Sequence, residues 1–262
     1  FTHFILQNFH NNKNTGDPEK IRATVRQLAA DGANVVKIFA SMSIRDGGSQ
    51  ALSDEQIEAA CDEATAQGLR SVVHAYGAES LTVSILAGCT TIEHGNRYSD
   101  DVIQLMAERG TYLDPHIGLL FSNYFEHKDR FLGTGNYHEK GFALMRDAVP
   151  IGLETFKRTL ANGNVKIVFG TDAGAGAHGR NYEELIYRVR DGGQDPMEAI
   201  VSATGLAAES LNLLKQLGTL APGMEADIIA VDGNPLTDIT AVRRVVFVMK
   251  GGKVYKNTAP DS

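Results

Sequence analysis

The chain has 262 residues, a formal net charge of −7, and a composition that is 43% hydrophobic and 22% charged. This length is sufficient for one large domain, or for a domain with a small appendage. The acidic balance argues against a nucleic-acid surface, and no window reaches the roughly 20 apolar residues that cross a bilayer. We therefore expect a small, uncharged or basic-tolerant partner, with no nucleic acid and no membrane.

The chain contains two cysteines, Cys61 and Cys89. Two cysteines are too few for a disulfide framework, and we interpret both as small buried hydrophobic residues. The first ten residues lack the basic region and cleavage pattern of a secretory signal. These features favour a reducing, cytoplasmic location.

Helices and strands alternate from residue 17 onward, after a weakly patterned start in which residues 4–6 resemble the remnant of a strand. Asp17-Pro18 begins a helix, Asp31-Gly32 ends it, and a strand follows at 34–40. Ser53 and Gln56 form a capping box at the start of a second predicted helix, at 53–68. Further helices are predicted at 78–87, 99–110, 149–161 and 182–190, and one more from residue 195. Further strands are predicted before His74, before His94, at 111–114 and at 165–169. This alternation predicts a parallel sheet or barrel with right-handed crossovers.

Two segments depart from the alternation. The first is the segment 117–164, which puts nearly fifty residues between two predicted strands. Its first half is rich in aromatic residues, and a loop this long suggests a function such as that of a lid. After residue 217, short β runs at 227–231 and 245–249 are separated by Gly and Pro turns, which is typical of hairpins. We therefore expect a main domain at 1–216 and a small β segment at 217–262.

Four predicted strands end at or near a residue that can bind a metal: Lys37, His74, His94 and Asp172. Strands covered on both faces should be continuously apolar, so these polar residues need an explanation. In a β/α barrel, the carboxyl-terminal edge of the strands carries the chemistry. Imidazoles on neighbouring strands suit zinc and related metals.

Lys37 and Asp172 each allow several roles. A buried Lys37 would present a neutral amine, which can form a Schiff base, act as a base, or react with carbon dioxide to give a carbamate that bridges two metals. A lysine that extends to the surface and pairs with a carboxylate is an equally good interpretation of Lys37 alone. Asp172 can bind a metal, accept a proton from water, or cap the following loop.

The order of these residues and the motifs around them resemble the amidohydrolase superfamily, in particular its imidazolonepropionase-like and Xaa-Pro dipeptidase-like branch. The motifs are Val-Val-His74-Ala, Ile-Glu-His94-Gly and Gly-Thr-Asp172-Ala-Gly, preceded by Lys37. The segment at 218–228, Gly-Thr-Leu-Ala-Pro-Gly-Met-Glu-Ala-Asp-Ile, resembles the return of such enzymes into a small β-sandwich. The resemblance covers about residues 17 to 257.

The resemblance implies an α/β fold, namely the later strands of a TIM-like (β/α)8 barrel, with a carboxyl-terminal piece of a β-sandwich. It also implies that Lys37, as a carbamate, bridges two divalent ions, usually zinc. His74 and His94 would hold one ion, while Asp172 would bind the other and transfer a proton to the leaving amine. The implied reaction is hydrolysis of a peptide or N-acyl amino acid amide bond, and the implied partner is therefore a small-molecule or dipeptide substrate.

One feature departs from the family pattern, because the chain lacks the His-x-His pair of the first barrel strand. The eight histidines are His3, His10, His74, His94, His116, His127, His138 and His178. We therefore interpret the chain as the carboxyl-terminal portion of a longer enzyme. Three alternatives remain: hydrolysis of a cyclic amide, a catalytically silent fragment that forms oligomers, and a Schiff-base aldolase that uses Lys37.

Further residues are candidates for substrate binding. His116, His178 and Arg180 are expected to face the mouth of the barrel, where they can hold a substrate carboxylate, and Tyr76 can donate a hydrogen bond. Each is equally compatible with a solvated loop position. A homo-oligomer is compatible with the sequence.

Overall fold

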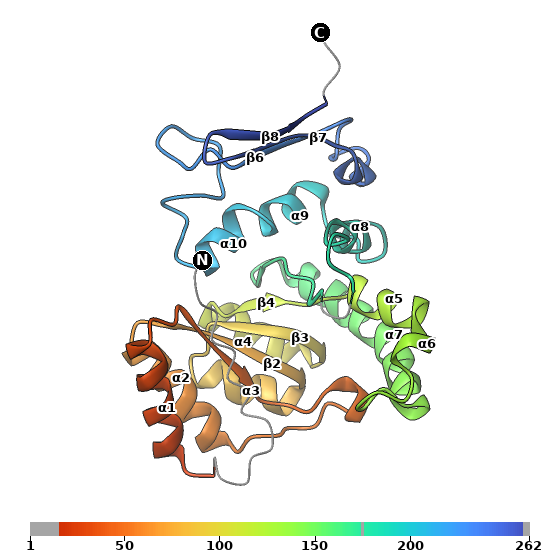
Figure 1. Ribbon diagram of the computed structural model, residues 1–262. Helices are drawn as coiled ribbons and strands as arrows, with labels where there is room; N and C mark the ends of the chain where they lie inside the picture. The colour runs from red at the N-terminus through yellow and green to blue at the C-terminus, as the bar shows by residue number, and fades with distance from the viewer. Residues whose placement is uncertain (1–15, 174–175, 259–262) are drawn as a thin grey trace. The chain divides into compact units, whose positions relative to one another are not determined.

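The computed structural model of the protein describes residues 16–173 and 176–258 (Figure 1). The chain divides into two compact units, which we call unit 1 (1–115 and 124–167) and unit 2 (116–123 and 168–262). The predicted strand remnant at 4–6 lies outside the described residues. The predicted domain boundary between residues 216 and 217 stays a prediction.

Unit 1 contains a five-stranded parallel sheet with its strands in chain order, which confirms the predicted α/β class. The strands are β1 (Val35–Phe39), β2 (Arg70–Gly77), β3 (Thr91–Arg97), β4 (Tyr112–Asp114) and β5 (Lys166–Ile167). The helices before and between the first four strands are α1 (Pro18–Ala30), α2 (Asp54–Ala66), α3 (Ala78–Leu86) and α4 (Asp100–Arg109). Each of these helices lies where the sequence predicts one.

Local signals explain these helix boundaries. The Asp17 side chain accepts a hydrogen bond from the Glu19 amide, and Pro18 occupies the first turn of α1. Ser53 and Gln56 form the predicted capping box of α2. The helices then pack on one face of the sheet, where Val36 and other buried apolar residues form the core. The opposite sheet face is therefore the one left for polar side chains.

The segment 117–164 is mostly helical, so the prediction of a long loop was wrong. It forms α5 (Leu119–Glu126), α6 (Lys128–Phe131) and α7 (Glu139–Asn162). The predicted helix at 149–161 is only the second half of α7, which continues across Pro150. A short 3-10 helix, η1 (Ile44–Asp46), follows β1, and the guanidinium of Arg45 lies 4.1 Å from the ring centroid of Tyr137 just before α7.

Cys61 of α2 and Cys89, which precedes β3, are joined by a disulfide. The prediction of two separate hydrophobic residues was therefore wrong, although both side chains are buried as expected. Disulfides are typical of oxidising compartments, so this bond weighs against a cytoplasmic location. Among the described residues, no helix has the length and apolar character needed to cross a membrane.

Unit 2 contains helices and a three-stranded antiparallel sheet. The helices are α8 (Tyr182–Arg190), α9 (Pro196–Ser202), α10 (Gly205–Ser210) and the 3-10 helix η2 (Ile239–Arg243), and the strands are β6 (Ile228–Val231), β7 (Val245–Lys250) and β8 (Lys253–Asn257). Gly251 and Gly252 have φ angles of 54° and 77°, which suit the tight turn between β7 and β8. The predicted hairpin is confirmed.

Candidate active site

In unit 1, His74 of β2 and His94 of β3 meet on adjacent strands, each three residues before the end of its strand. Their ring centroids are 4.5 Å apart, and both side chains are buried. Strict alternation would direct His94 to the core face that Ile92 occupies. Instead, the backbone of His94 is left-handed (φ 73°), which breaks the alternation beside the ring of His74. Left-handed backbone at a non-glycine residue is strained and clusters at functional sites.

Tyr76 completes an aromatic cluster with these two histidines. Its ring stacks on that of His94 at 4.5 Å and 9°, and it meets the His74 ring edge-on at 5.0 Å. The Tyr76 amide donates a hydrogen bond to Ser41 Oγ (3.1 Å), and a Cβ on Gly48 would lie 2.9 Å from the Tyr76 Cβ. The Tyr76 ring is therefore held from the loop that follows β1.

Lys37 lies on β1 and is half-buried, so the expectation of a buried lysine was only partly right. Its neighbours Val36 and Ile38 point to the helix-covered core, which places Lys37 on the opposite face with Phe39. The Lys37 Nζ lies 5.6 Å from the Phe39 ring centroid, and the Phe39 ring lies 5.1 Å from that of His74. Lys37 and His74 thus border the same aromatic side chain.

A carboxylate pair lies one strand further along the same sheet. Glu93 of β3 is in register with Asp114 of β4, and a carboxylate oxygen of each lies within 4.8 Å of the other. The sequence analysis did not identify this pair. Asp114 could have been recognised as a candidate ligand, because it ends a predicted strand just as the sequence analysis expected of His74 and His94.

In unit 2, the structure brings His116 and Asp172 together. One potential ligand atom of each lies within 4.8 Å of the other. Both residues have left-handed backbone, with φ angles of 45° and 43°. His116 is buried, whereas Asp172 is exposed. Asp172 belongs to unit 2 and the other three predicted metal ligands to unit 1, so their convergence on one centre stays a prediction.

Glu184 of α8 supports the turn that follows His116. Its carboxylate accepts hydrogen bonds from the amides of Ile117 (2.6 Å), Gly118 (3.0 Å) and Leu119 (2.8 Å). These amides lie at the start of α5, where backbone donors have no partner within the helix. Glu184 is fully buried. A carboxylate at a helix amino terminus is also favoured by the helix dipole.

Arg188, one turn further along α8, is also fully buried and lies 3.8 Å from the carboxylate of Glu184. Its Nη1 donates to the carbonyl of Val168 (2.8 Å), four residues before Asp172. The Glu184–Arg188 pair thus holds the backbone near both His116 and Asp172. Sequence reasoning missed this pair, although acidic and basic residues four apart in the predicted helix at 182–190 were a usable signal.

The two remaining predicted residues lie on the loop before α8. His178 is exposed. Arg180 donates to the carboxylate of Glu183 (2.8 Å), so it already has an anionic partner within its own segment. Gly174 and Ala175, in the predicted Gly-rich loop, lie outside the described residues.

Comparison with known proteins agrees with this architecture. The model of the amidohydrolase family matches residues 3–255. Ochratoxinase of Aspergillus niger is 32% identical over 248 residues, which are 91% of this chain and 49% of that protein. Imidazolonepropionase of Geobacillus thermodenitrificans is 27% identical over 202 residues, which are 73% of this chain and 41% of that protein.

A crystal structure of a Xaa-Pro dipeptidase with methionine bound in its active site superposes with a TM-score of 0.81 and 34% identity, over 92% of this chain and 59% of that one. The chain thus spans about half the length of the curated relatives named above. The family match covers nearly the whole chain and agrees with the parallel sheet and the histidines on its strands. The protein therefore belongs to the amidohydrolase family.

Proposed function

We propose that the protein is a metal-dependent amidohydrolase that cleaves a peptide or N-acyl amino acid amide bond. The observation that carries this proposal is the pair of buried imidazoles, His74 and His94, on the adjacent parallel strands β2 and β3. Similarity to an ochratoxinase and to a Xaa-Pro dipeptidase supports an amide substrate with an amino acid on one side.

The residues fit a divalent metal centre. Imidazoles are good zinc ligands, and the ring of Tyr76 fixes the orientation of His94 as supporting residues around metal sites do. We propose that His74, His94, Lys37 as a carbamate, and Asp172 would hold the divalent metal. Bound divalent ions would polarise the scissile carbonyl and acidify water for attack on it.

The protein side chains would then handle the protons. Asp172 accepts a proton as water adds to the carbonyl carbon, and it returns that proton to the nitrogen as the carbon–nitrogen bond breaks. We propose that His116, which lies beside Asp172, contacts the reacting group. Tyr76, His178 and Arg180 stay proposals as substrate-binding residues.

Metal analysis combined with an amide-hydrolysis assay tests this function. We expect bound divalent metal, and we expect His94→Ala to lower both the metal content and the activity. Asp172→Asn and Lys37→Ala should abolish hydrolysis. His127→Ala is the matched control, because it also removes an imidazole but from the start of α6, and it should leave both readouts unchanged. A metal-free protein that is indifferent to the first three changes would show a silent fragment instead.

A cyclic-amide hydrolase is the second candidate, favoured by the similarity to imidazolonepropionase. Assaying linear N-acyl amino acids beside cyclic amides separates the two, because each candidate predicts turnover of only one class. A Schiff-base enzyme would instead be trapped covalently at Lys37 by borohydride with a carbonyl substrate. A Schiff-base mechanism would leave His74 and His94 without a role.

A further inference from the structure

The loop that follows β1, which we call the β1 loop (residues 40–51), contacts the proposed centre through its backbone. The amides of Ala40 and Ser41 both donate to the carbonyl of His74, at 3.0 and 3.3 Å. The Tyr76 amide in turn donates to Ser41 Oγ (3.1 Å). The β1 loop therefore fixes the backbone of one proposed ligand and the backbone of the tyrosine whose ring stacks on the other.

Hydrogen bonds within the β1 loop join its two arms. The Ala51 amide donates to the carbonyl of Ala40 at the base of the loop (2.8 Å). Nearer the tip, the Met42 amide donates to the carbonyl of Ser49 (2.7 Å). The 3-10 helix η1 lies between these arms and forms the tip. Because the loop is closed on itself, a contact made at η1 limits the movement of the base that bonds to β2.

Four residues, which we call the Arg45 clasp, fasten η1 to the start of α7: Arg45, Asp46, Asn136 and Tyr137. Arg45 Nε donates to Asn136 Oδ1 (2.9 Å), and Asn136 Nδ2 donates to Asp46 Oδ2 (2.6 Å). The Arg45 guanidinium lies 4.1 Å from the Tyr137 ring centroid, a distance at which a cation is attracted to the ring. A Cβ on Gly141 would lie 3.3 Å from the Arg45 Cβ, so the first turn of α7 packs directly on η1.

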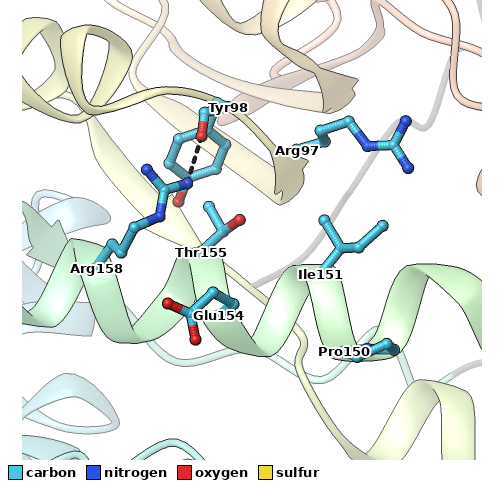
Figure 2. A pocket seen from close by; sticks show the side chains of 7 residues that line it. All are labelled: Arg97, Tyr98, Pro150, Ile151, Glu154, Thr155 and Arg158. Atoms are coloured by element: carbon cyan, nitrogen blue, oxygen red, sulfur yellow. Dashed lines mark hydrogen bonds between the residues drawn. The ribbon is translucent and has the colours of Figure 1, made fainter.

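The same helix is anchored on β3, the strand that carries His94. Asn96, two residues further along β3, donates from Nδ2 to the carbonyl of Ala148 in α7 (2.9 Å). Arg158, near the end of α7, donates from Nη2 to the carbonyl of Tyr98 (2.6 Å) (Figure 2). Helix α7 is therefore fixed at several points to the strand of one imidazole, and at its start to the loop that holds the strand of the other.

We propose that Arg45 is a positioning residue of the metal centre, which acts through the β1 loop on His74 and Tyr76 and not by contact with metal or substrate. Gly141 and Ala148 lie about two turns apart on α7, so a stiff span of roughly 10 Å separates the clasp from the first anchor on β3. The helix thus holds both strands of the imidazole pair at a fixed spacing. The inference rests on the proposed function, because it concerns the metal centre proposed there.

Amide hydrogen exchange tests the clasp without metal or turnover. It is followed by NMR in the presence of a chelator, and the rates at Ala40 and Tyr76 are divided by those of the α4 amides. We expect Arg45→Met to raise this ratio about fivefold, because the loop opens locally once the clasp is lost. Arg22→Met is the control, since it removes an ion pair between α1 and α2 and should leave the ratio unchanged. An unchanged ratio in Arg45→Met would overturn the proposal.

Zinc affinity, measured by competition with a chromophoric chelator, tests the effect on the centre. We expect Arg45→Met and Asn136→Ala each to raise the zinc dissociation constant roughly fivefold, somewhat less than the loss of a group that touches a metal ligand. Arg45→Lys keeps the charge over the Tyr137 ring and should recover part of the affinity. The double variant should be hardly worse than Arg45→Met alone, because both changes open the same clasp. Multiplied effects, or an unchanged dissociation constant in Arg45→Met, would overturn the positioning role.

The two measurements separate failure of this inference from failure of the proposed function. Native-like zinc affinity in all variants of a zinc-binding protein would remove only the role of Arg45. A native protein that binds no zinc would refute the proposed function, whereas faster exchange at Ala40 and Tyr76 in Arg45→Met would still support the clasp. Thermal unfolding of each variant verifies that the fold is intact, and Asn136→Ala tests the same contact if Arg45→Met does not fold.

Discussion

The side chains of Glu184 and Arg188 form an ion pair in which neither residue is exposed to solvent, with 3.8 Å between Arg188 Nε and Glu184 Oε1. Such a pair is costly to bury, but removing one partner costs more, because it leaves the other charge buried and uncompensated. The pair is therefore a sensitive point in unit 2.

We expect Glu184→Gln to destabilise unit 2 by roughly 3 kcal/mol, because Arg188 loses its counter-charge and an amide nitrogen replaces one acceptor oxygen. Amide hydrogen exchange at residues 117–119 should accelerate, because the Glu184 carboxylate accepts a hydrogen bond from each of these three amides. Glu198→Gln, at an exposed position in the first turn of α9, is the control and should change neither quantity. Unchanged exchange at 117–119 in Glu184→Gln would contradict the role of the carboxylate.

Gly47 and Gly48 provide an internally matched test of the Tyr76 contact. Both have left-handed backbone, so alanine at either position should cost about 1 kcal/mol of strain. Only at Gly48 would the added Cβ meet Tyr76, at 2.9 Å, whereas nothing lies within 4 Å at Gly47. We expect Gly48→Ala to lose roughly a further 1–3 kcal/mol and to weaken metal binding about tenfold. Equal metal affinities in the two variants would show that Tyr76 does not position His94.

The disulfide between Cys61 and Cys89 should stabilise unit 1 by lowering the conformational entropy of the unfolded chain. For a sequence separation of 28, the chain-entropy estimate is about 3–4 kcal/mol. We expect no free thiols in the native protein, and a lower denaturation midpoint after reduction. The Cys61→Ser/Cys89→Ser double variant should be less stable and indifferent to reductant. Two titratable thiols in unreduced protein would refute the bond.

Tyr98 should make the protein less stable in alkaline solution. Burial raises the pKa of Tyr98 to about 12, from an ordinary value near 10. Below pH 10 both folded and unfolded states hold the proton. Between about pH 10 and 12 the unfolded state releases it while the folded state keeps it, so the stabilisation is lost as pH rises, by up to roughly 3 kcal/mol.

Chemical denaturation at several pH values tests this sign. Tyr98→Phe should lose stability at neutral pH, because its hydroxyl pairs with Thr159, but should show a shallower decline above pH 10. Tyr255→Phe, at a position that is 63% exposed, should keep the decline of the native protein. Parallel pH profiles for the native protein and Tyr98→Phe would disprove the effect.

The sequence determined the local order of this protein. Asp17-Pro18, the Ser53/Gln56 capping box and the limits of α8 follow from short-range hydrogen bonding and periodicity, and the structure confirms them. The placement of His74 and His94 on neighbouring strands was predictable for the same reason, although each strand continues for three residues beyond its histidine. The family resemblance rested on the motifs around these histidines, and it was correct.

Tertiary packing decided the length of α7 and the pairing of the two cysteines, which local sequence patterns do not encode. Pro150 looks like a helix start, yet α7 continues across it as it packs on β3, where Asn96 holds the carbonyl of Ala148. Cys61 and Cys89 are 28 residues apart, and only the packing of α2 near the start of β3 brings their Cα atoms to 5.1 Å.

The same distinction applies to the candidate site. The sequence supplied residues able to bind metal, but the stacking of Tyr76 on His94 and the hydrogen bonds of buried Glu184 join segments distant in sequence. Local propensity is encoded within a few residues, whereas burial and charge pairing depend on which surfaces meet after folding. For that reason the sequence alone identified His74 and His94, and the tertiary structure revealed what holds them.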